Sequence, residues 1–330
     1  MDKIIEVKNL VTSYYTKTER VQAVQDISFY VNKGETFCLV GESGCGKSAT
    51  CRSILRLIRL PGKITDGQVI YKGIDLLKLS EKEMIKYRGK EIAMIFQDPM
   101  TALNPVLTIK EQIQEAFKEK NLTNEQKEEK VIELLKLVGI PSPKQRLKEY
   151  SHQFSGGMKQ RAMIAAALAS NPNLLIADEP TTALDVTIQD QIIKLINKLK
   201  KELDMSIMLV THDMGVVAQM SDRVAIMYAG KIMEMADTVS LFGKPRHPYT
   251  LGLLKSIPCI GKSGEKLISI RGNPPDLSDQ LRGCPFEPRC NYKEDKCREL
   301  LPDLIEIEKG NYSRCHFAEK IKDEKGLIEL

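Results

Sequence analysis

The chain has 330 residues, more than the usual size of one domain, which favours a large domain with an appendage, or two domains. Apolar residues make up 42% of it and charged residues 28%, an ordinary globular composition that excludes a disordered or collagen-like protein. The 49 Lys and Arg residues against 44 Asp and Glu leave a net charge of +5 with the basic residues spread along the chain, which argues against a dedicated nucleic-acid binder.

The N-terminal sequence MDKIIEVKNL lacks the basic and then apolar plan of a secretory signal. No apolar run reaches the roughly 18 to 20 residues that cross a bilayer. We therefore expect a cytosolic chain, whose role at any membrane would need a partner protein.

From Ile4 to about Ala236, short β-rich runs alternate with helical patterns. The runs are QDISFYV, TFCLV, IAMIF, LLIAD, SIMLV and RVAIMYAG, and several are apolar enough to be buried on both faces. This alternation predicts an α/β domain with a largely parallel central sheet. Between IAMIFQ and QFSGGM lie IKEQIQEAFKEKNL and NEQKEEKVIELLKLVGI, which are rich in helix formers and predict an inserted helical subdomain at about 98–170.

The character of the chain changes after about residue 240. The segments GKPRHPYT, SIPCIGKSG, GNPPDLSDQ and GCPFEPRC concentrate proline, glycine and cysteine without long periodic elements. We expect a second, smaller domain there, held together by something other than a large hydrophobic core.

The segment GESGCGKS at 41–48 follows the apolar run TFCLV and precedes the helical pattern ATCRSILRLIRL. Strand, glycine loop and helix in this order are the context that a P-loop requires. Its glycines would let backbone N–H groups turn towards phosphate oxygens, and the helix N-terminus adds partial positive charge. Lys47 would reach the β- and γ-phosphates, while the Ser48 hydroxyl would ligate Mg²⁺. A chance match to the motif is the alternative.

LLIADE, residues 174–179, is an apolar strand that ends in two carboxylates. The carboxyl ends of strands are where ligands bind in such sheets. Asp178 is suited to hold Mg²⁺ through its water shell, and Glu179 could polarise a water for in-line attack on the γ-phosphorus. The alternative is a strand that merely ends in acidic turn residues, and the upstream P-loop disfavours it.

Together with Gln97, QFSGGMKQR at 153–161, ALD at 183–185 and TH at 211–212, these motifs give the chain a resemblance to the ATP-binding subunits of ABC transporters over about residues 4–236. QDPMTALNP at 97–105, FSGGMKQR and HPYTLGLLKSIP at 247–258 resemble the oligopeptide and dipeptide importer branch, which includes nickel importers. The resemblance implies a P-loop ABC-type ATPase domain over 1–240, with a central mostly parallel sheet, an antiparallel β part and the inserted helical subdomain. A small, irregular, cysteine-rich C-terminal domain would follow over 241–330.

The resemblance also implies a function. The chain would be the Mg-ATP-hydrolysing, energy-coupling subunit of an importer for dipeptides or oligopeptides, at the cytoplasmic face of the cell membrane. Its partners would be a second ATPase subunit, identical or homologous, in a head-to-tail dimer, two transmembrane permease subunits and an extracellular substrate-binding protein, with no nucleic acid. A nickel-type importer ATPase, a soluble ABC ATPase outside transport and a regulatory iron-sulfur protein with a nucleotide switch are the alternatives.

The same resemblance assigns roles to single residues. Gln97 would sense Mg²⁺ and the attacking water and contact the membrane subunits, and His212 would hydrogen-bond the γ-phosphate and couple it to Glu179. Asp185 would communicate between the two sites of the dimer. The implied nucleotide-binding residues are Tyr14, Gly41, Ser43, Gly44, Cys45, Gly46, Lys47, Ser48 and Ala49, and the implied magnesium residues are Ser48, Gln97 and Asp178. Tyr14 would stack on adenine, although its neighbour Tyr15 is not separated from it, and packing at a sheet edge is the alternative.

Ser155, Gly156 and Gly157 would form the signature loop, which in this family lies against the γ-phosphate bound by the opposite ATPase. Ser155 is well placed to cap the helix through MKQRAMIAAALA, so that N–H groups and a positive dipole end face an anion. Phe154 and Met158 depart from the Leu and Gln of the commonest signature but fit the peptide-importer branch. Cys45 stands where serine is commoner, and we expect it to make the site sensitive to thiol reagents.

Four cysteines, Cys284, Cys290, Cys297 and Cys315, are separated by five, six and seventeen residues in the proline-rich tail. Zinc knuckles with C-x2-4-C spacing are absent, so four thiolates at this wider spacing favour a [4Fe-4S] cluster. The similarity to peptide-type importer tails points the same way. Zinc is the alternative cofactor, with His316 as a possible replacement ligand, and disulfides or free thiols complete the alternatives.

Overall fold

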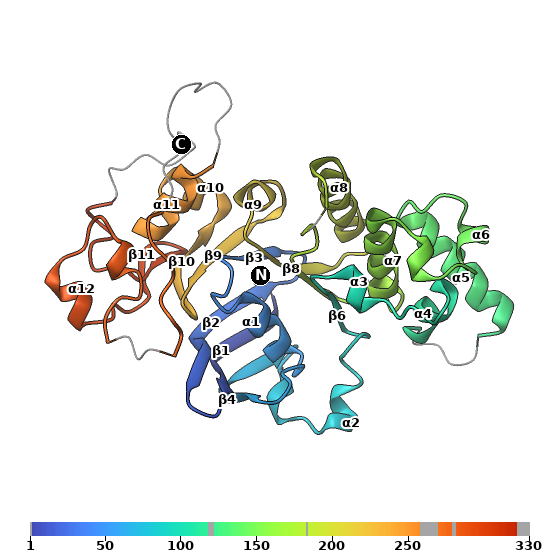
Figure 1. The fold of residues 1–330 in the computed structure, drawn as a ribbon, viewed down its shortest axis with the longest axis horizontal. Helices are drawn as coiled ribbons and strands as arrows, with labels where there is room; N and C mark the ends of the chain where they lie inside the picture. The colour runs from blue at the N-terminus through green and yellow to red at the C-terminus, as the bar shows by residue number, and fades with distance from the viewer. Residues whose placement is uncertain (1, 118–121, 183, 258–269, 279–281, 322–330) are drawn as a thin grey trace. The chain divides into compact units, whose positions relative to one another are not determined.

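The computed structural model describes residues 2–117, 122–182, 184–257, 270–278 and 282–321 (Figure 1). The chain divides into two compact units. Unit 1 comprises Met1–Ile4, Asn32–Gly34 and Lys78–Leu209, and unit 2 comprises Ile5–Val31, Glu35–Leu77 and Val210–Leu330. Ala183 of the ALD motif and Pro258 of the tail segment lie outside the described residues.

Unit 2 contains an antiparallel sheet with the strand order β2-β1-β4-β5. Its strands are β1 (Lys3–Tyr15), β2 (Arg20–Asn32), β4 (Gly62–Tyr71) and β5 (Ile74–Asp75). Apolar residues alternate along β1, and Val7, which pairs with Val69 of β4, is buried. This period of two places one face of the sheet in the core.

A second set of strands in unit 2 has the order β11-β12-β10-β9-β3. The strands are β3 (Thr36–Val40), β9 (Arg223–Tyr228), β10 (Lys231–Asp237), β11 (Ile305–Glu308) and β12 (Asn311–Ser313). Strands β3 and β9 are parallel, and every residue of β3 is buried. The helices of the unit are α1 (Lys47–Ile54), α9 (Met214–Met220), α10 (Thr238–Gly243), α11 (Pro248–Lys255) and α12 (Asp295–Glu299).

Unit 1 combines strands with a run of helices. Strands β6 (Ile92–Ile95) and β7 (Leu174–Asp178) are parallel, and β8 (Ser206–Thr211), reached through α8 (Val186–Glu202), lies next to β7. Between β6 and β7 the chain forms α3 (Pro99–Ala102), α4 (Ile109–Glu115), α5 (Asn124–Leu137), α6 (Pro143–Arg146) and α7 (Gly156–Leu168). The short α2 (Glu81–Met84) precedes them. No helix in the described ranges combines the length and apolar character needed to cross a membrane.

The α/β class predicted from the sequence is confirmed, with the parallel pairs β3–β9 and β6–β7 and with the antiparallel β part that the resemblance implied. Strands β9 and β10 form a tight antiparallel hairpin, because Ala229 and Gly230 both take positive φ, 47° and 79°, as two-residue hairpin turns require. The tail then adds β12 to β10, with Glu234 opposite Ser313, and β11 to β12. The segment after residue 240 thus extends a sheet of unit 2, and a separate C-terminal domain stays a prediction.

Candidate functional site

The glycine loop of unit 2 is held in a shape that only glycine permits at two points. A Cβ atom on Gly41 would lie 2.1 Å from the Met227 carbonyl oxygen, and one on Gly46 would lie 2.0 Å from that of Ala23. Gly46 also has a φ of 106°, in the left-handed region, and is the residue from which α1 begins. The glycines at these positions therefore bring the loop backbone against its neighbours.

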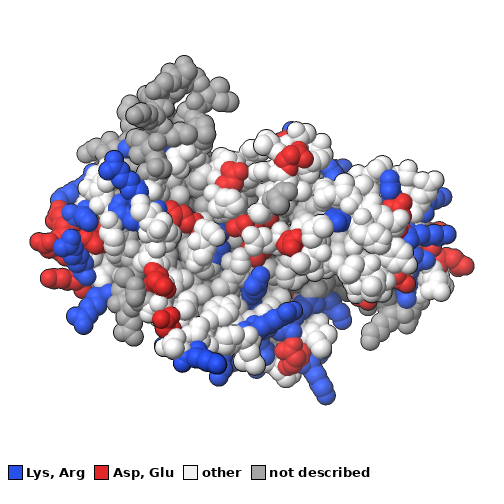
Figure 2. Space-filling view, viewed as in Figure 1, with Lys and Arg blue, Asp and Glu red and all other residues white. Residues whose placement is uncertain are grey.

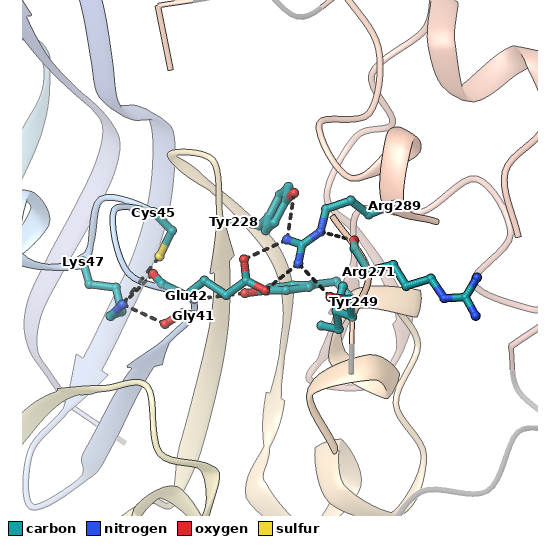
Figure 3. Close-up of polar contacts among 9 residues, drawn as sticks. Gly41, Glu42, Cys45, Lys47, Tyr228, Tyr249, Arg271 and Arg289 are labelled. Carbon is teal, nitrogen blue, oxygen red and sulfur yellow. Dashed lines mark hydrogen bonds and ion pairs between the residues drawn. The ribbon is translucent and has the colours of Figure 1, made fainter. Parts of the chain in front are cut away.

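Lys47 points back into its own loop. Its Nζ atom donates hydrogen bonds to the carbonyl oxygens of Gly41, at 2.7 Å, and Glu42, at 2.9 Å, and its side chain is buried (Figure 3). A buried ammonium is stable only with such oxygen partners. The positively charged Lys47 ammonium group thus lies at the centre of the loop and is held by the loop's own carbonyl oxygens.

Cys45 is buried within the glycine loop. Its Sγ atom is buried and lies 3.8 Å from Lys47 Nζ. Burial raises the pKa of the Cys45 thiol, an effect that the nearby Lys47 charge only partly offsets. Burial argues against the expected sensitivity of this residue to thiol reagents, because reactivity requires the thiolate and access to it; the sensitivity stays a prediction.

Glu42 joins the loop to the tail within unit 2. Its carboxylate accepts hydrogen bonds from two nitrogens of Arg289, at 2.7 and 3.1 Å, and its backbone N–H donates to the Tyr249 hydroxyl at 3.0 Å (Figure 3). Burial lowers the pKa of Arg289, but its contacts with Glu42 and with Tyr228 raise that pKa by a larger amount. The net pKa of Arg289 therefore lies above its ordinary value. The sequence does not predict this contact, since nothing in either local pattern links two positions 247 residues apart.

Tyr14 and Tyr15 differ in their surroundings. Tyr14 pairs with Gly62 across β1 and β4, and a Cβ atom on Gly62 would meet the Tyr14 ring at 2.7 Å. Tyr15 is 40% exposed, and Arg20 lies over its ring at 5.9 Å. The exposed ring is therefore that of Tyr15, whereas Tyr14 packs on the sheet.

In unit 1, Gln97 and Glu179 are hydrogen-bonded to each other. Gln97 Nε2 donates to Glu179 Oε2 at 2.9 Å, and the Thr182 hydroxyl donates to the same oxygen at 2.9 Å. Glu179 has a φ of 48°, a left-handed backbone that costs free energy for a residue with a side chain, and this kind of strain is concentrated at functional sites. Asp178, the last residue of β7, is buried. The contact with Thr182 was not predicted.

The signature segment also lies in unit 1. The Ser155 hydroxyl accepts a hydrogen bond from the Met158 N–H at 3.3 Å and caps α7, of which Gly156 and Gly157 are the first residues. Asp185 caps α8 in the same way, accepting from the Ile188 N–H at 3.0 Å. A Cβ atom on Gly157 would lie 3.0 Å from Ile188 Cγ2, so the N-terminal ends of α7 and α8 adjoin each other.

His212 belongs to unit 2, as do Tyr14 and the glycine loop. It follows β8 and is exposed, and the next residue, Asp213, caps α9 by accepting hydrogen bonds from the Gly215 and Val216 N–H groups. The aspartate beside the histidine thus has a local structural role.

The four tail cysteines of unit 2 line one small cavity together with His247, His316 and aromatic side chains. The four form no disulfide with one another. Burial raises the pKa of Cys284 to about 11 and of Cys315 to about 12, which favours their protonated forms. The cavity measures about 20 Å³, room for about one water, so the thiols as placed do not form a cage for a cluster. In the described part of the chain no group of three or more His, Cys, Asp or Glu residues is arranged to hold a metal ion.

Residues 24–182 match the family described as ABC transporter, and residues 233–297 match the oligopeptide/dipeptide transporter C-terminal region. The dipeptide transport ATP-binding protein DppD of Bacillus subtilis (strain 168) is 51% identical over 304 residues, which cover 92% of this chain and 91% of that protein. The chain belongs to the ABC transporter family. The oligopeptide transport ATP-binding protein OppD of the same strain is 50% identical to this ABC ATPase over 313 residues, covering 94% of one and 87% of the other.

Solved structures agree with this assignment. An ATP-binding cassette in a dimeric post-hydrolysis state, bound to ADP and Pi, aligns with a TM-score of 0.64 and 30% identity over 71% of this chain and 98% of that one. The resemblance indicated by the motifs is confirmed, including its oligopeptide/dipeptide branch. This ABC ATPase is accordingly an ATP-hydrolysing, energy-coupling subunit of a transporter.

Proposed function

We propose that this ABC ATPase drives the import of dipeptides or oligopeptides through separate permease subunits, to which it binds at the cytoplasmic face of the membrane. The observation that carries the proposal is the pairing of an ATPase region with the oligopeptide/dipeptide C-terminal region in one chain, together with about 50% identity to proteins named for dipeptide and oligopeptide transport. A substrate-binding protein would deliver the peptide from outside.

The glycine loop is the proposed phosphate cradle. Tyr15, or Tyr14 beside it, would stack on adenine, and the loop N–H groups of Gly41, Ser43–Gly46 and Ala49 would face the phosphates at the start of α1. Lys47 would exchange its two carbonyl partners for phosphate oxygens when nucleotide binds. Ser48, Gln97 and Asp178 are the proposed magnesium residues, and the bound ion would neutralise phosphate charge.

Glu179 is the proposed general base. Its carboxylate is positioned by Gln97 and Thr182, and a carboxylate held in this way can accept a proton from a water that attacks the γ-phosphorus. His212 would donate a hydrogen bond to the γ-phosphate, where negative charge accumulates as the bond breaks.

The signature loop would act on nucleotide bound to a second ATPase chain. Ser155 is the exposed N-terminal cap of α7, which has thirteen residues. The start of that helix would therefore offer its dipole and N–H groups to an anion. Asp185, at the start of the adjoining α8, would carry the signal between the two sites. Each complete site would then need two chains, identical or homologous.

We propose no nucleic-acid partner for this ABC ATPase, whose basic residues are spread along the chain. On the face drawn in Figure 2, Lys and Arg atoms are interleaved with Asp and Glu atoms.

The substrate can be tested with the assembled transporter in liposomes. We expect ATP hydrolysis to rise when the binding protein is loaded with a dipeptide or a short oligopeptide. Stimulation by nickel and by no peptide would contradict the proposed substrate, and would leave the ATPase assignment unaffected.

For the four-cysteine cavity, we propose a [4Fe-4S] cluster as the cofactor, with zinc as the alternative. The support is the donor set, because Cys284, Cys290, Cys297 and Cys315 share one cavity and thiolates are the ligands of such clusters. Absorbance near about 400 nm with matching iron and sulfide in anaerobically purified protein is expected; a colourless protein with one zinc per chain would contradict the cluster.

A further inference from the structure

The side chain of Arg289 forms the link between the tail and the glycine loop. The residue lies in a short 3-10 turn, Glu287–Arg289, between two of the tail cysteines, and its guanidinium contacts both carboxylate oxygens of Glu42 (Figure 3). The side chain of Arg289 is 6% exposed and that of Glu42 is 25% exposed. A two-pronged ion pair at this depth is far less screened than one at the surface, and it fixes orientation as well as distance.

Arg289 is itself immobilised from the tail side. Its Nε atom donates to the Arg271 carbonyl oxygen at 2.9 Å, and Nη1 donates to the Tyr228 hydroxyl at 3.3 Å. The guanidinium also lies over the Tyr228 ring at 5.7 Å and near the Phe286 ring at 6.0 Å. Because the guanidinium nitrogens are hydrogen-bonded and the group lies near two aromatic rings, the orientation of the Arg289 side chain towards Glu42 is fixed.

Tyr249 supplies a second, independent hold on the same loop residue. Its hydroxyl accepts the Glu42 N–H, and its buried ring packs against Tyr228 at 4.7 Å and Phe286 at 5.3 Å. Glu42 is thus held through its side chain by Arg289, through its N–H by Tyr249 and through its carbonyl by Lys47.

We propose that Arg289 is a positioning residue for nucleotide binding, which acts through Glu42 to keep the glycine loop in its receiving shape. The inference rests on the proposed phosphate cradle. When Lys47 turns to the phosphates, its hold on the Glu42 carbonyl is lost, and Arg289 and Tyr249 remain to fix that end of the loop. A loop that is already ordered loses less conformational entropy when it binds a ligand. Removing the anchor should therefore weaken nucleotide affinity, whereas the hydrolysis step should be largely spared.

The test measures the Kd of the full-length chain for Mg-ATP and for Mg-ADP, and the KM and kcat of the assembled transporter. We expect Arg289→Gln and Glu42→Gln each to raise Kd and KM about five- to twenty-fold, with kcat within about two-fold of wild type. The double variant should be no weaker than either single variant, because the two side chains act as one pair. Arg289→Lys should restore part of the affinity, since it keeps the charge but loses the fork.

Arg298→Gln is the matched control. Arg298 belongs to the same tail and pairs with Glu287 at 3.0 Å, but its side chain is 64% exposed and this ion pair joins two residues of the tail. Its Kd should equal that of the wild type. An unchanged Kd in both Arg289→Gln and Glu42→Gln, additive losses in the double variant, or an equal loss in Arg298→Gln would overturn the proposal.

Two further measurements keep the outcome interpretable. If Arg289→Gln does not fold, Glu42→Gln leaves the tail sequence intact and decides the question by its Kd alone. Lys47→Ala should abolish binding of Mg-ATP, and if this variant binds Mg-ATP as tightly as wild type, the proposed cradle is wrong. If Lys47→Ala loses affinity for Mg-ATP but Glu42→Gln does not, the cradle stands and only the proposed role of Arg289 is refuted.

Discussion

Glu179 sits at the end of a buried strand with a carboxylate that Gln97 and Thr182 already hold. Because Gln is isosteric with Glu, the Glu179→Gln variant keeps these hydrogen-bonding partners while losing the ability to take a proton. We expect its hydrolysis rate to fall about 10²- to 10⁴-fold, while its Kd for Mg-ATP stays near that of wild type. Steady-state ATPase assays and equilibrium binding measure the two quantities.

Glu202→Gln is the control for that experiment, since Glu202 ends α8 on the surface and forms an exposed ion pair with Lys198. It should hydrolyse ATP as wild type does. Near-normal turnover in Glu179→Gln would remove this residue from its proposed role.

Glu234, in the middle of β10, should by itself make the free energy of unfolding depend on pH. Burial raises the pKa of Glu234 from 4.5 to about 7, and the groups that face it are the Arg246 N–H, which donates at 2.6 Å, and the side chains of Thr250 and Arg246 with the His247 N–H. The folded protein therefore retains a proton that the unfolded chain loses above pH 4.5. This contribution to stability is full below that pH and is lost as the pH rises to about 7.

Comparison with Glu234→Gln isolates that contribution, because the amide does not titrate and all other groups cancel. Measured by denaturant unfolding, the variant should gain stability relative to wild type between pH 4.5 and 7, by an amount on the order of 3 kcal/mol in total. The difference should then stay constant at higher pH. A difference that does not change with pH would show that folding does not raise the pKa of Glu234.

At the scale of elements, the sequence predicted the parts of the site that are contiguous in the chain. The strand, glycine loop and helix around Lys47 follow from TFCLV, GESGCGKS and the helical pattern after it, and Ser155 caps α7 as expected. Hydrophobic periodicity and capping residues act over a few positions, so a short stretch of sequence is enough to predict the helices and strands that they form.

A comparison of two capping residues can separate the structural role of Ser155, at the start of α7, from its proposed role in ATP hydrolysis. Ser155 and Thr123 both cap helices of similar length in unit 1, α7 and α5. Ser155→Ala and Thr123→Ala should each cost about 1 kcal/mol of unfolding free energy. Only Ser155→Ala should also depress the ATPase rate of the assembled complex, because only α7 would face a nucleotide. Equal ATPase rates in the two variants would contradict the role of the signature loop.

At the scale of the whole molecule, the sequence could not predict contacts made by distant segments. Glu42 and Arg289 are 247 positions apart, and neither lies in a pattern that identifies the other. The pairing of β12 with β10 likewise arises from tertiary packing. Exposure, which distinguishes Tyr15 from Tyr14, also depends on what packs over each ring and not on its own identity.

The central claim is that each catalytic site is completed by two ATPase chains. The most direct test compares hydrolysis per chain in the assembled transporter with that of the isolated chain, diluted until light scattering or sedimentation finds only monomers, at saturating Mg-ATP. The account predicts that the solitary chain binds nucleotide but hydrolyses it at least about a hundred-fold more slowly. Equal rates per chain in the monomer and in the assembly would contradict it.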